Sequence, residues 1–246
     1  MERKKSNIVI LLIFIPVLLF GSEKEKIYKA YISDNMEEWK ALIDEMQIKQ
    51  KQSTDQLAEL LNYQYGYIGY CLGVDEKKDA KRYLSLAEEN LEKLEEMNYN
   101  ASSIHAYQSA FYGYKIGLAS YKAPLLGPKS VNHAELAIAA DSLNPLGYVQ
   151  YGNALFYMPA VFGGSKSEAI INFKKAKTLM ELNPQEINHD WNYLSLLAII
   201  GQSYEELGDL EQAEVFYQLA LQKEPDFKWV KNELLPQIEK QENNDK

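Results

Sequence analysis

The amino-acid sequence predicts an all-α protein: an α-solenoid of antiparallel helix pairs with a C-terminal capping helix. Three observations predict this fold class. Apolar residues recur every three or four positions, as they do in 80–94, which is the spacing of an amphipathic helix. No stretch combines sustained alternation with β-branched enrichment, the signature of strands. A set of small residues also repeats four times along the chain, which indicates repeated structural units.

The composition excludes several classes of protein. The chain has 246 residues, with 26 Lys and Arg against 35 Asp and Glu, a formal net charge of −9. This acidic balance argues against nucleic acid as the main partner, because phosphate contacts need a basic face. Cys71 is the single cysteine, which excludes a disulfide framework and a Cys-rich zinc site. Tyrosine is unusually common, at 18 residues against 8 phenylalanines, so its placement bears on function.

The first segment has the pattern of an export signal. A basic start at 2–5 precedes an apolar run over 8–20, and Gly21 and Ser22 suit a cleavage site. A retained membrane anchor is the alternative, but a spanning helix needs about 20 apolar residues, and Pro16 interrupts this shorter run. We expect export to the periplasm or the extracellular space, with no stable membrane span after cleavage. The expected division is a signal peptide over 1–22, a helical repeat domain over 23–241 and a polar tail over 242–246.

The repeated unit is a helix, a turn, a second helix and a stop. Each second helix carries two small residues seven positions apart with a third position between them, all on one helix face. These sets are Ala80, Leu84 and Ala87; Ser130, Ala134 and Ala137; Ala169, Phe173 and Ala176; and Ala213, Tyr217 and Ala220. Because proline cannot continue a helix, the last three second helices are expected to end at Asn144-Pro145, Asn183-Pro184 and Glu224-Pro225.

A glycine stands upstream of each set, inside a tyrosine-rich helical pattern. A glycine in the middle of a helix costs about 1 kcal/mol relative to alanine, so four in register need a structural reason. We expect that two helices approach each other closely at each of them. The four are Gly69, Gly113, Gly152 and Gly201.

Residues 194–227 resemble the tetratricopeptide repeat (TPR). The order of large, large, Gly, Tyr, Ala, aromatic, Ala and Pro in that family appears as Leu197, Ile200, Gly201, Tyr204, Ala213, Tyr217, Ala220 and Pro225, with Gly208 at the usual turn. Residues 24–50 look like a degenerate first hairpin, and 227–241 look like the closing helix that a solenoid needs, which makes about five hairpins. The chain is similar to exported bacterial TPR proteins. The resemblance implies a right-handed superhelix whose concave groove binds proteins or peptides.

Two units depart from the repeat. The glycine precedes the first small residue by 12 positions in the last unit and by 11 in the first clear one, but by 17 in both middle units. We therefore expect loops over 123–130 and 158–167, side by side on one edge, each followed by a helix that a serine can cap. Leu125, Leu126 and Phe162 in these loops either cover a pocket or a partner site, or fold onto their own repeats. Insertions in repeat proteins often lie on the binding face.

Tyrosine gathers on the first helices of the repeats. In the repeat family, the positions six before and one after the glycine line the concave groove, and tyrosine offers a large contact area at low entropic cost. The alternative is that these rings pack between neighbouring helices. Leu146 and Ser195 hold two further groove positions. The candidate partner-binding residues are Tyr63, Tyr70, Tyr107, Tyr114, Asn153 and Gln202.

The sequence contains no recognisable catalytic arrangement. His105, His133 and His189 lack metalloprotease spacing to one another or to a glutamate. We therefore expect no catalytic residue, no metal site and no cofactor. The predicted function is a non-catalytic scaffold of the cell envelope that binds a protein or peptide in the tyrosine-lined groove. The alternative is a small-ligand or transport accessory protein, with a pocket closed by the two inserted loops.

Overall fold

The computed structural model describes residues 22–49 and 51–244, which contain eleven α-helices and no strand. The predicted signal peptide over 1–22 lies outside the described residues, apart from Ser22, which caps the first helix. The helices are α1 (Glu23–Ile32), α2 (Met36–Gln47), α3 (Thr54–Gly73), α4 (Lys77–Glu96), α5 (Ala101–Leu118), α6 (Ala123–Ala140), α7 (Pro145–Tyr157), α8 (Lys166–Met180), α9 (Trp191–Glu205), α10 (Leu210–Lys223) and α11 (Leu235–Asn244). Shorter segments are the 3-10 turns η1 (Ser120–Lys122) and η2 (Ala160–Phe162) and the π-helical η3 (Val230–Leu234).

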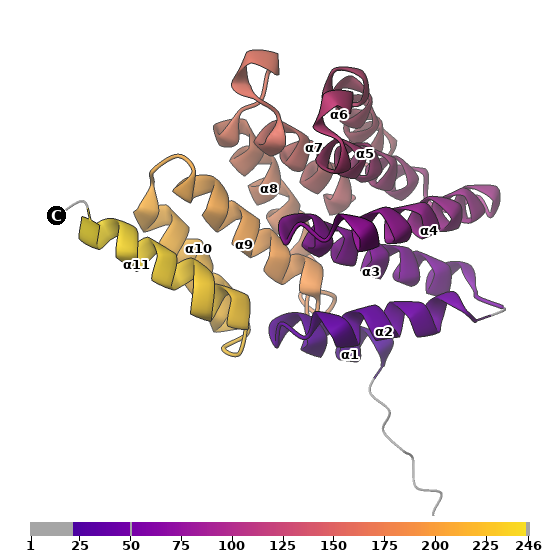
Figure 1. The fold of residues 1–246 in the computed structure, drawn as a ribbon, viewed down its shortest axis with the longest axis horizontal. Helices are drawn as coiled ribbons and strands as arrows, with labels where there is room; N and C mark the ends of the chain where they lie inside the picture. The colour runs from indigo at the N-terminus through magenta and orange to yellow at the C-terminus, as the bar shows by residue number, and fades with distance from the viewer. Residues whose placement is uncertain (1–21, 50, 245–246) are drawn as a thin grey trace, which may run out of the picture.

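Within the described residues the helices form five hairpins followed by α11, which confirms the predicted solenoid. Each odd-numbered helix from α1 to α9 packs against the even-numbered helix that follows it, and consecutive hairpins pack against one another. Figure 1 shows the hairpins fanned from α1 and α2 to α9 and α10, with α11 beside α10. Ile238 of α11 is buried in the apolar cluster of the last hairpin. The helix reaches Asn244, beyond the expected end at residue 241.

Local signals explain where the helices begin. Ser53 and Gln56 form a capping box at α3, in which each side chain accepts a hydrogen bond from the backbone N–H of the other, at 3.2 Å and 3.0 Å. Asp209 caps α10 by accepting from the Gln212 backbone N–H at 3.1 Å. Pro145 opens α7, at a position where its missing N–H breaks no helical hydrogen bond.

Two of the four repeat glycines receive an aromatic ring from the paired helix. A Cβ atom added to Gly152 would lie 2.5 Å from the ring of Phe173, and one added to Gly201 would lie 2.3 Å from the ring of Tyr217. The predicted close approach is confirmed in these two units. It is wrong at Gly113, where no atom lies within 4 Å of an added Cβ. The position that holds a ring in the other two units is alanine in this one.

The segment 123–130 is helical, so the prediction of a loop there is wrong. It forms the start of α6, with Pro124 in the first turn, where an N–H has no helical partner to lose. Leu126, in the first turns of α6, is buried, so this end of the helix packs against the rest of the protein. Ser130, expected to cap the helix, lies inside it and donates to the Ser109 carbonyl at 2.9 Å. The extra residues of this unit therefore lengthen α6.

The segment 158–167 does form a turn between α7 and α8. It contains η2 and then Gly163, whose φ of +97° lies in the left-handed region that favours glycine. Ser165 caps α8 by accepting from the Glu168 backbone N–H at 3.2 Å. The same five-residue excess is therefore accommodated in two ways, as added helix in one unit and as a turn in the next.

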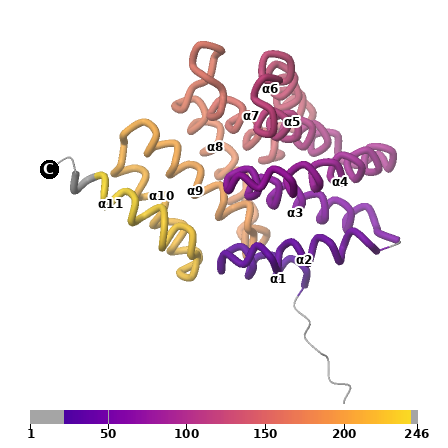
Figure 2. Tube along the Cα trace, viewed as in Figure 1, coloured from indigo at the N-terminus to yellow at the C-terminus, as the bar shows by residue number. Residues whose placement is uncertain are grey.

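The solenoid curls until its two ends meet. Helix α1 contacts α9, and Tyr28 Oη donates to Glu224 Oε2 at 3.0 Å across 196 positions of sequence. Trp191, the first residue of α9, has its ring centre 5.8 Å from that of Tyr31 and 5.1 Å from that of Trp39. The trace in Figure 2 follows this closure, with the start of α9 beside the first hairpin. Much of the concave side is therefore packed interior.

Candidate binding surfaces

The concave side carries a cluster of side chains from α3, α5 and α7. Tyr114 Oη donates to the Tyr65 carbonyl at 2.9 Å, and its ring stacks on that of Tyr65 with centres 5.7 Å apart. Tyr107 packs edge-on against the same ring at 5.8 Å. Gln150 Nε2 donates to Tyr65 Oη at 3.0 Å, and Asn153 donates to Gln150. The structure thus brings three of the predicted partner-binding residues together around Tyr65.

Tyr63 and Tyr70 do not join this cluster. The Tyr63 side chain is only 2% exposed, its ring packs edge-on against Trp39, and its carbonyl accepts from Trp39 Nε1 at 3.0 Å. The Tyr70 ring lies beside that of Tyr67, with centres 6.0 Å apart. Tyr63 is therefore buried in the core instead of lining the groove, and Tyr70 lies beside Tyr67, outside the cluster.

A one-residue error in register explains this result. Counting back from Ala80 by the twelve positions of the last unit reaches Ile68, which is buried, rather than Gly69. One residue turns a side chain by about 100° around a helix. The groove positions of α3 are consequently Asn62 and Gly69. A Cβ added to Gly69 would lie 3.2 Å from the Tyr114 hydroxyl, which places this glycine against the tyrosine cluster.

A cavity of about 180 Å³ remains on the concave side. Asn62, Leu146 and Ser195 hold the same groove position in three different repeats, six residues before the packing position. All three line this cavity, so the repeat register, once corrected in α3, predicts where the cavity lies. The lining consists of Asn62, Tyr65, Pro145, Leu146, Val149, Met180, Asp190, Asn192, Ser195 and Leu196. Gln202 is half-buried on α9 and does not line the cavity.

A partly buried carboxylate faces this cavity. Asp190 Oδ1 accepts from the backbone N–H and from the side-chain amide of Asn192, both at 3.0 Å. Burial raises the pKa of Asp190 above its usual value, and these hydrogen bonds and the charge of Lys24 limit the rise. The volume is below the roughly 300 Å³ of drug-sized ligand pockets. The cavity therefore suits a single side chain or a very small molecule.

A second hollow, of about 420 Å³, lies between α2 and α4, and its lining includes Ile48 and Leu86. Arg82 Nη2 pairs with Asp44 Oδ1 at 3.3 Å beside it. Both charged side chains are exposed, so this pair contributes little to stability. Neither hollow is lined by the predicted pocket residues Leu125, Leu126 and Phe162.

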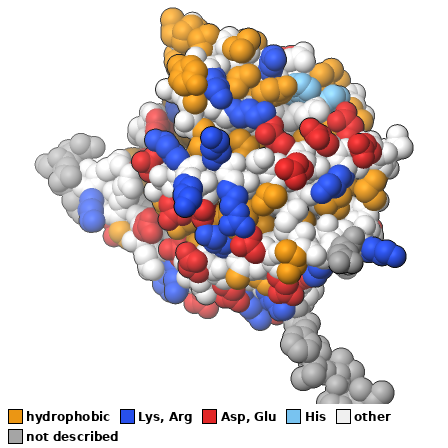
Figure 3. All heavy atoms as spheres, turned by 45° about the vertical axis from the view of Figure 1, so that its right-hand side comes forward, with side chains coloured by type: hydrophobic (Ala, Val, Ile, Leu, Met, Phe, Trp, Pro, Cys, Tyr) orange, Lys and Arg blue, Asp and Glu red, His pale blue; other side chains and the backbone are white. Residues whose placement is uncertain are grey.

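Large apolar side chains are exposed where the third hairpin (α5 and α6) and the fourth hairpin (α7 and α8) turn. Tyr121 of η1 is 82% exposed, Leu125 of α6 is 67%, and Val161 and Phe162 of η2 are 83% and 71% exposed. We call these four residues the tip surface. Figure 3 shows hydrophobic side chains gathered at this upper edge of the molecule. The predicted loop residues Leu125 and Phe162 thus each face solvent at their own turn, while Leu126 is buried.

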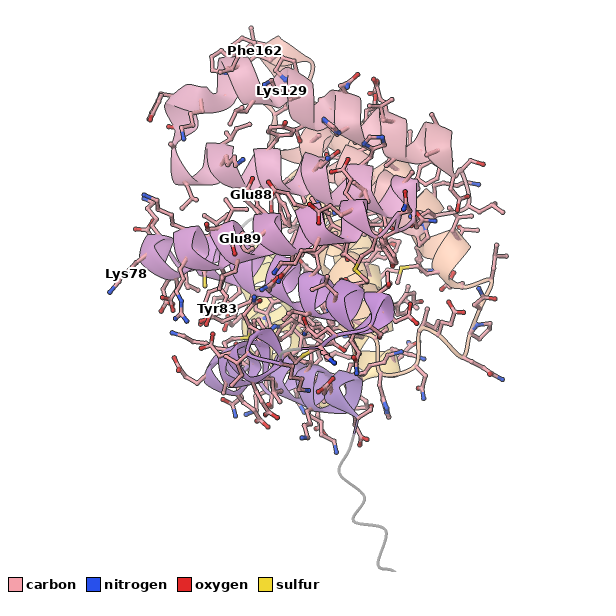
Figure 4. All side chains as sticks on the ribbon, turned by 90° about the vertical axis from the view of Figure 1, so that its right-hand side faces the viewer. Lys78, Tyr83, Glu88, Glu89, Lys129 and Phe162 are labelled. Atoms are coloured by element: carbon pink, nitrogen blue, oxygen red, sulfur yellow. The ribbon has the colours of Figure 1, made fainter. Side chains whose placement is uncertain are left out.

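Lysines adjoin the tip surface, although the chain as a whole is acidic. Lys122 and Lys129 are exposed on η1 and α6, and Figure 4 labels Lys129 and Phe162 at the same upper end of the molecule. Lys166 begins α8, where its Nζ donates to the Phe156 carbonyl at 2.8 Å. The tip surface therefore combines exposed apolar area with positive charge.

Other reactive features are few in the described ranges 22–49 and 51–244. No group of three or more His, Cys, Asp and Glu side chains there is placed to hold a metal ion. No helix in them combines the length and the apolar character that crossing a membrane requires. Cys71 is buried, and burial raises the pKa of its thiol to about 11, so the thiol stays protonated at neutral pH.

The likeness of this chain to known proteins lies in its fold. The sequence matches no protein-family model and no curated protein. The solved structure of the HusA haemophore from Porphyromonas gingivalis matches with a TM-score of 0.58 and 17% identity, over 76% of this chain and 96% of that one. The MamA protein matches with a TM-score of 0.37 and 15% identity, over 87% of this chain and 97% of that one. The first match shows that the helical fold is shared with the haemophore.

Proposed function

We propose that this chain is an exported, non-enzymatic binding protein of the TPR type that docks a partner protein through its tip surface. The observation that carries the proposal is the exposure of Tyr121, Leu125, Val161 and Phe162 at two turns on one edge. Scattered apolar residues are ordinary on protein surfaces. Apolar side chains that gather on one edge instead mark interaction sites, and the lysines nearby favour a partner whose contact surface has an acidic rim.

The concave side supports a smaller role than the resemblance implies. Tyr107 and Tyr114 already pack on Tyr65, and Tyr107 is only 6% exposed. A peptide laid along this side would have to displace those contacts. The cavity beside Asp190 has room for one side chain of a partner, so it supplements docking at the tip surface.

The double substitution of Val161 and Phe162 by serine is expected to weaken partner binding by about 30-fold, the equivalent of the ~2 kcal/mol of an interface hot spot. Both side chains are exposed, so the folded state should be retained. The measurement is affinity isolation of the partner from native envelope fractions with tagged mature protein. The dissociation constant of the purified pair is then determined for each variant.

Ile171→Ser is the matched control, because Ile171 is an equally exposed apolar residue on α8, at 67%. It should bind the partner as the unaltered protein does. An unchanged dissociation constant for the double variant would exclude the tip surface as the docking site. Equal losses in the control and the double variant would point to a general effect of surface apolarity.

A second candidate function is the carriage of haem or a similar planar ligand, favoured by the fold shared with a haemophore over 96% of that protein. The cavity of about 180 Å³ is too small for a ligand of that size. We therefore propose that such a ligand lies against Leu125 and Phe162, with its carboxylates near Lys122 and Lys129.

Titration of the mature protein with haemin, followed by visible absorbance, tests this candidate. The expected result is a saturable one-to-one change that weakens at least about tenfold in the Val161→Ser/Phe162→Ser variant, because an apolar contact of about 1.4 kcal/mol is lost. Ile171→Ser should leave the titration unchanged. A signal that does not saturate, or that is the same in all three proteins, rules out haem carriage on the tip surface and leaves protein docking as the proposed function.

A further inference from the structure

Two histidines from neighbouring helices face each other on the outer side of the third hairpin. His105 of α5 and His133 of α6 are 28 positions apart in sequence, yet their Nδ1 atoms are 3.2 Å apart. Gln108 Oε1 lies 3.0 Å from the same Nδ1 of His105. Both rings are half-exposed, so a solute can reach them. Two ring nitrogens and an amide oxygen therefore converge at a place that solvent can enter.

The separation of the two nitrogens fits two ligands of one metal ion. Zinc–imidazole bonds are about 2.0–2.1 Å long. Two such bonds at 90° place their nitrogens about 2.9 Å apart, and at the tetrahedral angle about 3.4 Å apart. The observed 3.2 Å lies between these values. Metal binding then needs little movement of either helix. Each ring must adopt the tautomer that carries its proton on Nε2, which leaves Nδ1 available to coordinate the metal.

The charged groups that act on His133 come from two helices, α4 and α6. Glu95 of α4 is close enough for its carboxylate charge to act on His133 and favour a bound cation, whereas Lys129 of α6 opposes it. Burial and the neighbouring His105 lower the pKa of His133. Tyr112 closes one side, with its ring centre 5.5 Å from that of His133.

We propose that His105 and His133 form an exchangeable site for a late first-row divalent cation, Cu²⁺ or Zn²⁺, with Gln108 as a further oxygen donor. Imidazole suits these metals. The protein supplies two imidazole nitrogens and one amide oxygen, and water would complete the coordination, as in sites that stay open to exchange. This inference does not rest on the proposed docking or haem function.

Calorimetric titration of the tag-free mature protein with CuCl₂ and with ZnCl₂ at neutral pH tests the site. We expect one equivalent to bind, and His105→Gln and His133→Gln each to weaken binding by at least about tenfold. His189→Gln is the control, because His189 packs against Tyr28 in another part of the molecule, with ring centres 5.0 Å apart. It should bind as the unaltered protein does. Far-UV circular dichroism checks that each variant is folded.

Electron paramagnetic resonance of the Cu²⁺ form gives a readout that a purely structural role of these histidines would not produce. Coupling to two imidazole nitrogens should appear in the unaltered protein and fall to one in His133→Gln. The proposal is overturned if no saturable binding occurs with metal in excess. It is also overturned if both glutamine variants bind as tightly as the unaltered protein.

Discussion

Replacing Trp191 by alanine is expected to lower the free energy of unfolding by about 3–5 kcal/mol, the usual range for a buried tryptophan. Trp191 is only 6% exposed, and its ring packs against Tyr31, Trp39 and Tyr65 from three other helices. A Cβ added to Gly66 would lie 2.6 Å from the same ring, so α3 lies directly against it. The substitution therefore opens a cavity where the first and last hairpins meet.

Urea unfolding followed by far-UV circular dichroism measures this loss without relying on tryptophan fluorescence. Trp229→Ala is the matched control, because Trp229 is half-buried and packs beside Phe227 at the edge of the array, and we expect a clearly smaller loss. Trp191→Phe should restore much of the stability, since no described residue accepts a hydrogen bond from the Trp191 Nε1. Equal losses in Trp191→Ala and Trp229→Ala would contradict the central role of this ring.

The second large effect is expected when a repeat glycine is replaced by alanine. This substitution should destabilise the protein at one repeat glycine and stabilise it at another. In Gly201→Ala the new Cβ would lie 2.3 Å from the ring of Tyr217. Such overpacking destabilises by about 1–3 kcal/mol and should outweigh the ~1 kcal/mol gained from helix propensity. In Gly113→Ala the new Cβ meets no atom within 4 Å. That variant should gain up to about 1 kcal/mol.

Thermal or urea unfolding of the two variants checks the sign of each change. The coupling to the ring is tested by making Gly201→Ala in a Tyr217→Leu background, where the penalty should shrink because the clashing ring is gone. A penalty that persists with leucine at 217 would place the strain in the α9 backbone. Stabilisation by Gly201→Ala would contradict the close packing of α9 and α10.

The helices and some of their boundaries could be predicted from the sequence because the signals are local. Helix α10 ends at Lys223, beside the expected stop at Glu224-Pro225, whereas α6 ends at Ala140 and α8 at Met180, before the expected stops at Asn144-Pro145 and Asn183-Pro184. Proline at 145, the serine and glutamine of the α3 capping box, and the spacing of small residues each act within a few turns of helix. The start of α6 was mispredicted because proline, here Pro124, is compatible both with a loop and with the first turn of a helix. The burial of Leu126 favours the helix, and burial depends on tertiary packing that local sequence patterns do not report.

The candidate surfaces were predicted only in part. The repeat register correctly located Leu146 and Ser195 at the concave cavity but placed Tyr63 where Asn62 lies. The sequence itself indicates this one-residue correction, because Gly69 precedes Ala80 by 11 positions, whereas the glycine of the last unit precedes its first small residue by 12. The exposed Leu125 and Phe162 were anticipated as features of the inserted segments. The close contact between His105 and His133 was not predicted, because the two residues are 28 positions apart in sequence and meet only through helix packing.

The sequence by itself determined the helical class, the hairpin order and the four packing sets, since each depends on contacts within one repeat. Only the tertiary structure decided that the ends meet and that the tyrosines of the concave side pack inward. Small rotations between successive repeats add up along a solenoid, and no single repeat encodes their sum. Contacts between residues as distant as Tyr28 and Glu224 form only once that sum has closed the array.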